Sequence, residues 1–576
     1  MSSTTTSAAP KPLQGGDKWL ALAAMMFAVA MTFIDQTIVS IAAPSIQEEL
    51  SLSDAGLQWV VNGYLLALAS LFALGGRLSD ILGHKKMVLI GVITFAVAST
   101  LCGFTPKTSY AEAWIVFFRV VQGAGAALMF PAALAIVFAA FPVKERGKAL
   151  ALFFGITGAF TALGPIVGGY LTAWTWRSIF WINIPVAIIA VILTLMSKSN
   201  TARKKDSIDW TGAGLITFGM GLSVLGFQQA SSWGWGNWKT IACIIIGIVL
   251  LGIFVRMESR IKVPLIKVRI FKDRAFAADN AVLFFASMTF VPVFFFVSLY
   301  AQVSLGYSAQ NAGLFLMYFF IGFVIASQIG GRILDKSGAK APMVLGCAIA
   351  VVGYAMWGFK TTELSASAVT PYIIVAGAGI GLLLSPASTD AVNRAIDASY
   401  GEVTGITQTM RYYGSSLGFA LLGTLMTTVV TKDLVSSLIG LGVPNAQANE
   451  IVSSMSSSSG GSAALSKAPS AMQEQIVKAV QTDYAEAIQV VLYGMSGLMV
   501  VAVIFAFFHP GGRFETSAEI ADESAQAVAA VPAQAEVQAE GATAPVATGN
   551  PNAEAIRRIV TWVVIIFLIY LAVKYL

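Results

Sequence analysis

The chain is poor in the residues that build metal and disulfide sites. Among its 576 residues there are three cysteines and two histidines. Cys102, Cys243 and Cys347 lie singly inside apolar segments, which predicts no disulfide framework. His84 and His509 lie at predicted membrane edges, so no imidazole metal site is expected. The Walker A and zincin motifs are absent as well. We therefore expect no enzyme, no catalytic residues, no metal and no cofactor.

Charge is also scarce, and apolar residues replace it. Only 11% of the residues are charged, 56% are hydrophobic, and the mean hydropathy is +0.75. This composition excludes a soluble protein of this length and predicts an all-α polytopic membrane protein. A sequence pI of 9.0 would suggest a nucleic-acid partner in a soluble chain. Here the basic residues fall in loops on one side, as the positive-inside rule expects, so no nucleic-acid partner is predicted.

The apolar runs predict fourteen membrane spans of about 20 residues each. Residues 19–197 form a first bundle of six spans, at 19–42, 57–79, 87–105, 112–135, 148–170 and 178–197. Residues 198–274 hold two linker helices, at 210–229 and 240–257, and a basic cytoplasmic connector. Residues 275–512 form a second bundle of six spans, at 275–300, 311–331, 341–358, 370–392, 404–428 and 485–508.

The remaining segments are polar, with one exception. Residues 1–18 are predicted to be a cytoplasmic tail, 429–484 an external loop with a possible surface helix at 471–485, and 513–556 a disordered tail. That loop either covers the outer mouth or is a slack linker. Residues 557–576 form an apolar run that is either an accessory anchor or an added segment. We expect a multi-pass protein of the plasma membrane, in a bacterium the inner (cytoplasmic) membrane.

One short charged segment occurs twice. GGRLSDILGHKK at 75–86 returns 255 positions later as GGRILDKSGAKA at 330–341, each time between two apolar runs. Such duplication is typical of transporters whose two similar halves rock about a shared site. The glycines should let the helix ends approach closely and turn tightly. The predicted switch residues are Gly76, Asp80, Gly83, Lys85 and Lys86 in the first copy, and Gly331, Arg332, Asp335 and Gly338 in the second.

Asp35 and Arg119 are ionisable residues within predicted spans, which makes them functional candidates. Asp35 lies 16 residues into an outward-running span, or roughly 24 Å, and Arg119 lies roughly 10 Å below the outer surface. The two should therefore lie at similar depth and pair. A carboxylate with a movable arginine could bind and release a proton near neutral pH. The alternative is a fixed structural ion pair or a cap on a kinked helix.

Two further groups carry weaker signals. The fifth span contains a proline among glycines, a composition that permits bending or close packing: Gly158, Gly164, Pro165, Gly168 and Gly169. Asp390, Arg394 and Arg411, near the inner ends of two later spans, are either a second ion network or loop anchors, and we favour anchors.

Taken together, residues 19–512 resemble the fourteen-helix branch of the major facilitator superfamily, the DHA2-type drug:proton antiporters. The resemblance is carried in chain order by IDQTIVSIAAP at 34–44, the segment 76–86, IVFFRVVQGAGAA at 115–127, the GPxxGG core at 164–169 and WRSIFWINIP at 176–185. The sequence departs from the family pattern at Ser40, Ile81 and His84. The resemblance implies two six-helix bundles plus two inserted helices, and proton-driven export.

The expected function is therefore a proton-coupled antiporter for lipophilic or cationic drugs and metabolites, with Asp35 and Arg119 as the proton-coupling residues. The candidates for the substrate cavity are Thr37, Gln122, Asn183, Gln408 and Arg411. The alternatives are a lipid or glycolipid exporter of the same fold and a non-transporting membrane sensor or scaffold. The expected partners are a small lipophilic or amphipathic substrate, protons and membrane lipids, and a monomer is expected.

Overall fold

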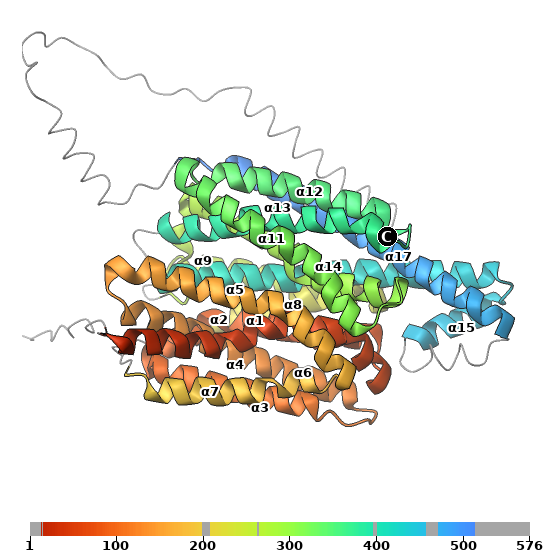
Figure 1. Cartoon of the computed structure of the whole chain (residues 1–576), viewed down its shortest axis with the longest axis horizontal. Coiled ribbons are helices and arrows are strands. Elements are labelled where there is room, and N and C mark those ends of the chain that lie inside the picture. The colour runs from red at the N-terminus through yellow and green to blue at the C-terminus, as the bar shows by residue number, and fades with distance from the viewer. Residues whose placement is uncertain are drawn as a thin grey trace, which may run out of the picture.

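The computed structural model describes residues 13, 15–198, 208–261, 264–394, 400–456 and 470–512, and these residues form an all-α protein (Figure 1). Thirteen helices of the described part are long and apolar enough to cross a membrane. α5 (Val143–Trp174), which has several undescribed side chains, packs beside α1 and brings the number to the predicted fourteen. Residues 513–556 and 557–576, with most of 1–18, lie outside the described residues.

The first bundle consists of α1 to α7, and its last span is interrupted. The bounds are α1 (Gly16–Leu50), α2 (Asp54–Leu82), α3 (His84–Gly103), α4 (Ala111–Ala140), α5, α6 (Ser178–Trp181) and α7 (Asn183–Met196). Ser53 begins α2 as an N-cap whose hydroxyl accepts from the Gly56 amide. The inserted pair is α8 (Trp210–Trp233) and α9 (Trp238–Glu258), and α8 also contacts α2 and α14.

The second bundle repeats the plan of the first. Its elements are η1 (Val268–Lys272), α10 (Arg274–Leu299) with the π-helical turn η2 (Tyr300–Ser304), α11 (Ala309–Ser337), α12 (Lys340–Thr361), α13 (Ala366–Arg394), α14 (Tyr400–Gly440), α15 (Asn445–Ser456) and α17 (Ser470–Phe508). α2 packs against α4 in the first bundle, and its counterpart α11 packs against α13 in the second. The two halves lie side by side (Figure 1).

Much of the predicted external segment 429–484 is helical. α14 continues without a break to Gly440, and α17 already begins at Ser470. The polar turns at these two ends have no apolar run to mark them, but they remain helical because their backbone hydrogen bonds continue from the spans. The alanine-rich stretch 471–485 is helical as predicted, as the first part of α17 rather than as a separate surface helix.

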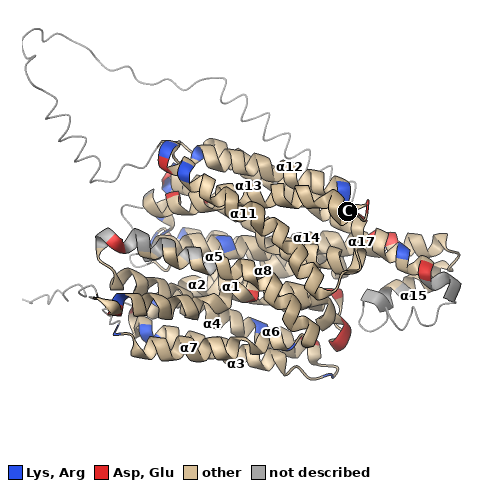
Figure 2. Cartoon of the chain, in the orientation of Figure 1, with Lys and Arg blue, Asp and Glu red and all other residues tan. Residues whose placement is uncertain are grey.

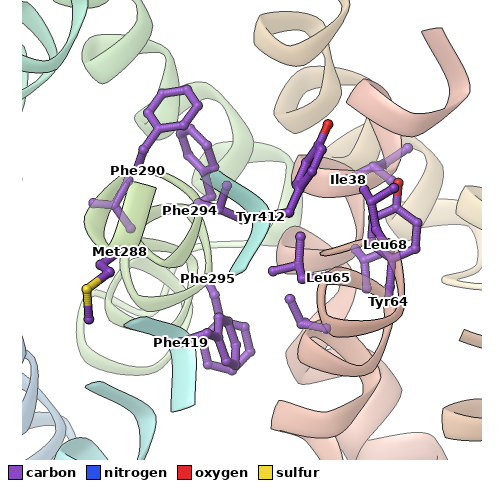
Figure 3. Close-up of a cluster of buried hydrophobic side chains, with 14 of the residues drawn as sticks. Ile38, Tyr64, Leu65, Leu68, Met288, Phe290, Phe294, Phe295, Tyr412 and Phe419 are labelled. Atoms are coloured by element: carbon purple, nitrogen blue, oxygen red, sulfur yellow. The ribbon is translucent and has the colours of Figure 1, made fainter. Parts of the chain in front are cut away.

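Charged residues lie mostly at the two ends of the helices (Figure 2). We call the end with Lys85 and Lys86 the inner end and the opposite end the outer end, following the predicted orientation. Between the halves, buried aromatic and aliphatic side chains of α10 and α14 face those of α1 and α2 (Figure 3). Tyr412 reaches the first half, with its ring centroid 6.0 Å from that of Phe72.

At the outer end the two halves are closed against each other. The Gln302 amide donates to the Ile41 carbonyl at 3.0 Å, and the Gln58 amide donates to the Thr427 hydroxyl at 3.0 Å. The cavity beside these contacts is only about 20 Å³. The structure is therefore a state in which the route between the halves is shut on the outer side.

Candidate functional site

Asp35 of α1 and Arg119 of α4 form a buried ion pair. The Arg119 Nη1 donates to Asp35 Oδ2 at 2.5 Å, and Gln122 Nε2 donates to the other carboxylate oxygen at 2.9 Å. Asp35 and Arg119 are each only 1% exposed. Because both carboxylate oxygens accept hydrogen bonds and the charge is neutralised, this arrangement suits the ionised form of Asp35. The predicted pairing is thus present, and it includes Gln122.

Arg119 is held mainly by helices other than α1. Its Nε donates to the Val60 carbonyl of α2 at 2.7 Å, and its guanidinium lies over the Tyr64 ring at 4.6 Å. On its own helix, α4, Arg119 Nη1 also donates to Gln122 Oε1 at 2.8 Å. Of the partners named here, only Asp35 lies on α1. A shift of α1 relative to α2 and α4 would therefore separate the pair while Arg119 kept its other contacts.

The first copy of the charged repeat is bonded to the end of the sixth span. Gly83 has a φ of 103°, which only glycine adopts readily, and it ends α2 and begins α3. Lys85 Nζ then donates to the Leu195 carbonyl at 3.1 Å and to the Ser197 carbonyl at 2.7 Å. Within the turn, Asp80 lies 3.6 Å from the ring of His84. Lys86 is exposed.

The second copy has an equivalent connection. Gly338, with a φ of 80°, forms an isolated parallel β-bridge with Gly512, which follows α17, the sixth span of its half. Arg332 and Asp335 are exposed there. In both halves, therefore, the turn after the second span is attached to the inner end of the sixth.

The glycines responsible for close helix approach are not the predicted ones. A Cβ on Gly76 would meet Pro131 at an ordinary 3.6 Å, and one on Gly331 would meet nothing within 4 Å. The preceding residues are the tight ones. A Cβ on Gly75 would lie 2.0 Å from a carbonyl oxygen of α4, and one on Gly330 would lie 2.5 Å from a carbonyl oxygen of α13. The prediction was one residue out because spacing alone cannot fix which face of a helix touches its neighbour.

The glycines of α5 pack against α1. A Cβ on Gly164 would lie 1.9 Å from Thr37 Oγ1, and one on Gly168 would lie 2.9 Å from the Ile38 side chain. The Thr37 hydroxyl donates to the Thr161 carbonyl of α5 at 3.1 Å. Thr37, a cavity candidate, is therefore engaged between these two helices.

The same helix also meets the other half. A Cβ on Gly313 of α11 would lie 2.2 Å from the Pro165 carbonyl oxygen, and one on Gly169 would lie 2.8 Å from the Ala309 carbonyl oxygen. The Gly-Pro and Gly-Gly steps thus lie at the outer junction of the two halves. The side of α5 around Gly158 falls outside the described side chains.

The other cavity candidates fall in two places. Asn183 is buried in the first bundle, where its amide donates to Ser99 of α3 at 2.9 Å, a contact within the bundle. Gln408 and Arg411 lie together on the inner part of α14, with Arg411 Nη1 donating to Gln408 Oε1 at 3.0 Å. Arg411 Nε has no hydrogen-bond partner among the described residues. The structure does not bring these residues to Gln122, which bonds to Asp35.

His509 directly follows the last residue of α17 and is fully buried at the inner end of the second bundle. Its Nε2 lies 3.0 Å from Asp390 of α13 and 3.6 Å from Asp279 of α10. The Gly511 amide donates to its Nδ1 at 3.0 Å. Since Nδ1 accepts, the ring proton is on Nε2 and faces Asp390. Asp390 is thus part of a buried network and is not a simple loop anchor.

The same hydrogen bond argues against a metal at this cluster. The His509, Asp279 and Asp390 donor atoms lie within 4.8 Å of one another, which a metal ion would accept. A histidine that binds a metal through one nitrogen normally donates from the other. Here the other nitrogen accepts from Gly511. The cluster therefore suits a histidine that joins the ends of three helices through hydrogen bonds.

His509→Asn is expected to destabilise the protein by about 1–3 kcal/mol, because it removes the donor that faces buried Asp390 while keeping an acceptor for Gly511. His509→Gln is the matched control, since its amide can still reach Asp390 and the partly exposed Gly511 amide can turn to water. Thermal unfolding of both variants in detergent at neutral pH measures the difference. Equal unfolding temperatures for the two variants would mean that the Asp390 contact is not the important one.

Comparison with known proteins identifies the family. Residues 25–419 match the family model described as Major Facilitator Superfamily. The chain belongs to the Major Facilitator Superfamily. The tetracenomycin C resistance and export protein of Streptomyces glaucescens is 33% identical over 72% of this chain and 77% of its own. Multidrug resistance protein 3 of Bacillus subtilis is 28% identical over 74% of this chain and 83% of its own.

Solved structures agree on the fold of this superfamily member. The Escherichia coli xylose transporter XylE, in a partially occluded inward-open conformation, has a TM-score of 0.55 at 12% identity, covering 87% of this chain and all of its own. An autoinhibited POT family peptide transporter has a TM-score of 0.59 at 12% identity, covering 87% and 98%. The chain is accordingly a multi-pass membrane transporter for a small molecule, and not an enzyme.

For this superfamily member, sequence reasoning missed Asp279. It lies near the start of the predicted span 275–300. The rule that singled out Asp35, that a carboxylate in a predicted span is a functional candidate, applies to it equally. The same rule could not predict that His509 is buried. His509 lies one position beyond a span, where hydropathy does not distinguish a buried residue from an exposed one.

Proposed function

We propose that this chain is a proton-coupled antiporter that exports lipophilic or cationic small molecules, with Asp35 as the proton-carrying carboxylate and Arg119 as its conditional partner. The observation that supports this most directly is the buried Asp35–Arg119 pair, which joins α1 to a guanidinium anchored on α2 and α4. An ionisable pair with almost no exposure is costly, and such pairs in membrane proteins mark ion and proton pathways.

The chemistry follows from the anchoring of Arg119. In this structure, which is closed on the outer side, Arg119 and Gln122 stabilise the Asp35 carboxylate, so no proton is needed on Asp35. When α1 moves away, Asp35 loses its positive partner inside an apolar bundle, and the neutral, protonated form becomes favoured. Proton release then accompanies the return of α1. One carboxylate can thus exchange one proton per cycle.

The direction and cargo of transport rest on the relatives. One is named for tetracenomycin C resistance and export, and another for multidrug resistance. Both come from bacteria, which supports a place in the bacterial inner membrane. Export of a lipid by the same cycle is the alternative outcome that the transport experiment must distinguish.

Reconstituted chain is expected to move ethidium, a lipophilic cation, against its gradient when a pH gradient is imposed across proteoliposomes. Ethidium movement that collapses with a protonophore, and is lost in empty liposomes, is the expected result. Gradient-driven movement of a fluorescent phospholipid analogue without ethidium would replace drug export by lipid export. Ethidium movement at the same rate with and without the pH gradient would contradict proton coupling.

A further inference from the structure

Two helices of the second bundle are much longer than a membrane span requires. α14 has 41 residues and α17 has 39. At 1.5 Å per residue each is about 60 Å long, roughly twice the 30 Å thickness of the hydrocarbon core. Their outer turns, with α15, project past the ends of the other helices (Figure 1). The protein therefore builds an additional structure on its outer side.

The projecting turns of α14 and α17 line an open cavity of about 520 Å³. Its lining includes three carboxylates, Asp433, Asp483 and Glu486, but only one ammonium group, that of Lys478. The volume is in the range of small-molecule sites. We call this cavity the outer acidic pocket.

Asp483 is the residue that indicates a ligand. Its side chain belongs to a residue only 4% exposed, and Oδ1 accepts from the Ser437 hydroxyl at 3.0 Å. Oδ2 is buried and has no hydrogen-bond partner among the described residues. None of the three carboxylates forms an ion pair with a described residue. A buried carboxylate oxygen without a donor is costly, so a bound positive group would lower the free energy of the pocket.

The outer acidic pocket lies directly outside the closed junction of the two halves. The small outer cavity at that junction is lined by Val430 and Tyr484, among others. Asp433 is one helical turn beyond Val430 on α14, and Asp483 immediately precedes Tyr484 on α17. Asp54 lines the junction cavity itself, and a molecule that left the route between the halves would meet the carboxylates of the outer acidic pocket beyond it.

The arrangement fits an organic cation better than a metal ion. A calcium site needs several oxygens converging on one point. Among the described residues, the three carboxylates do not form a group whose oxygens all lie within 4.8 Å of one another. Instead they are spread around a volume that holds a whole small molecule, with the Ser437 and Thr482 hydroxyls in the same lining.

We propose that the outer acidic pocket binds organic cations as they leave the route between the halves. This rests on the proposed function, and it makes cations the preferred class of substrate. The negative pocket would hold a cation outside the closed junction, so that it departs to the external medium rather than returning. A neutral lipophilic substrate would gain nothing from it.

The test is ethidium binding to the purified full-length protein, followed by fluorescence anisotropy. Asp483→Asn is expected to weaken binding about tenfold, corresponding to about 1.4 kcal/mol. Glu474→Gln is the matched control, because Glu474 is an exposed carboxylate on α17 that does not line the pocket. Binding of Nile red, a neutral dye, should be unchanged in both variants. If Asp483→Asn fails to fold, Glu486→Gln provides the same comparison.

Equal ethidium affinity in Asp483→Asn, Glu486→Gln and the parent would overturn the proposal. So would calcium chloride alone binding at micromolar concentration and displacing ethidium, which would indicate a metal site. Failure of the proposed function is a separate result. It would appear as the absence of gradient-driven efflux by the parent, whereas ethidium binding to the pocket needs no gradient.

Discussion

Proteoliposomes containing Asp35→Asn are expected to show no efflux driven by a pH gradient, down to the level of empty liposomes. The asparagine amide cannot ionise, so no proton can bind or leave at this position. Substrate binding should remain measurable, because the parent carboxylate is already neutralised by Arg119 and faces that residue and Gln122. Ethidium efflux under an imposed pH gradient and ethidium binding are the two measurements.

Loss of folding must be separated from loss of coupling. In Asp35→Asn the Arg119 charge stays buried without its carboxylate, and such a charge costs about 3–5 kcal/mol. The double variant Asp35→Asn/Arg119→Gln removes that charge as well and should recover stability without recovering gradient-driven efflux. Exchange of ethidium for ethidium, which needs no net proton movement, should persist in the double variant. Parental gradient-driven efflux in either variant would rule out Asp35 as the proton carrier.

Gly75→Ala is expected to destabilise the first half by about 1–3 kcal/mol, the usual cost of overpacking. The added methyl group would lie 2.0 Å from the Ala127 carbonyl oxygen, so α2 and α4 must separate. Gly76→Ala is the control from the next position. Its methyl group has room, and replacing glycine by alanine inside a helix favours the helix by up to about 1 kcal/mol.

The duplicated half provides the same comparison a second time. Gly330→Ala would place a methyl group 2.5 Å from the Leu382 carbonyl oxygen, whereas Gly331→Ala would add it in open space. In thermal unfolding in detergent, Gly75→Ala and Gly330→Ala should therefore each unfold at a lower temperature than the neighbouring control, Gly76→Ala or Gly331→Ala. A loss of stability in Gly76→Ala equal to that in Gly75→Ala would show that helix contact is not the cause.

The spans and the central ion pair could be read from the sequence because both depend on depth in the membrane. Hydropathy marks where a helix enters and leaves, and counting residues from those points placed Asp35 and Arg119 at one level, where the structure pairs them. The resemblance to the major facilitator superfamily was likewise confirmed by the match over residues 25–419.

What the sequence could not show is anything fixed by helix rotation or by structure outside the membrane. Gly75 rather than Gly76 faces α4, and a rotation of one residue is invisible in a run of apolar residues. The projecting turns of α14 and α17 are polar, so hydropathy does not distinguish them from a loop. It also gives no sign that the Asp483 carboxylate is buried there.

The inner attachments also have a consequence for how the protein is made. In the first half, Lys85 bonds to Ser197, and in the second, the turn at Gly338 pairs with Gly512. Each half therefore closes on its own last helix and needs nothing from the other to do so. As the ribosome releases Ser197, the first six spans already contain every partner of their closing contact. The two halves can thus be completed one after the other and only then be docked, with α8 packed against both.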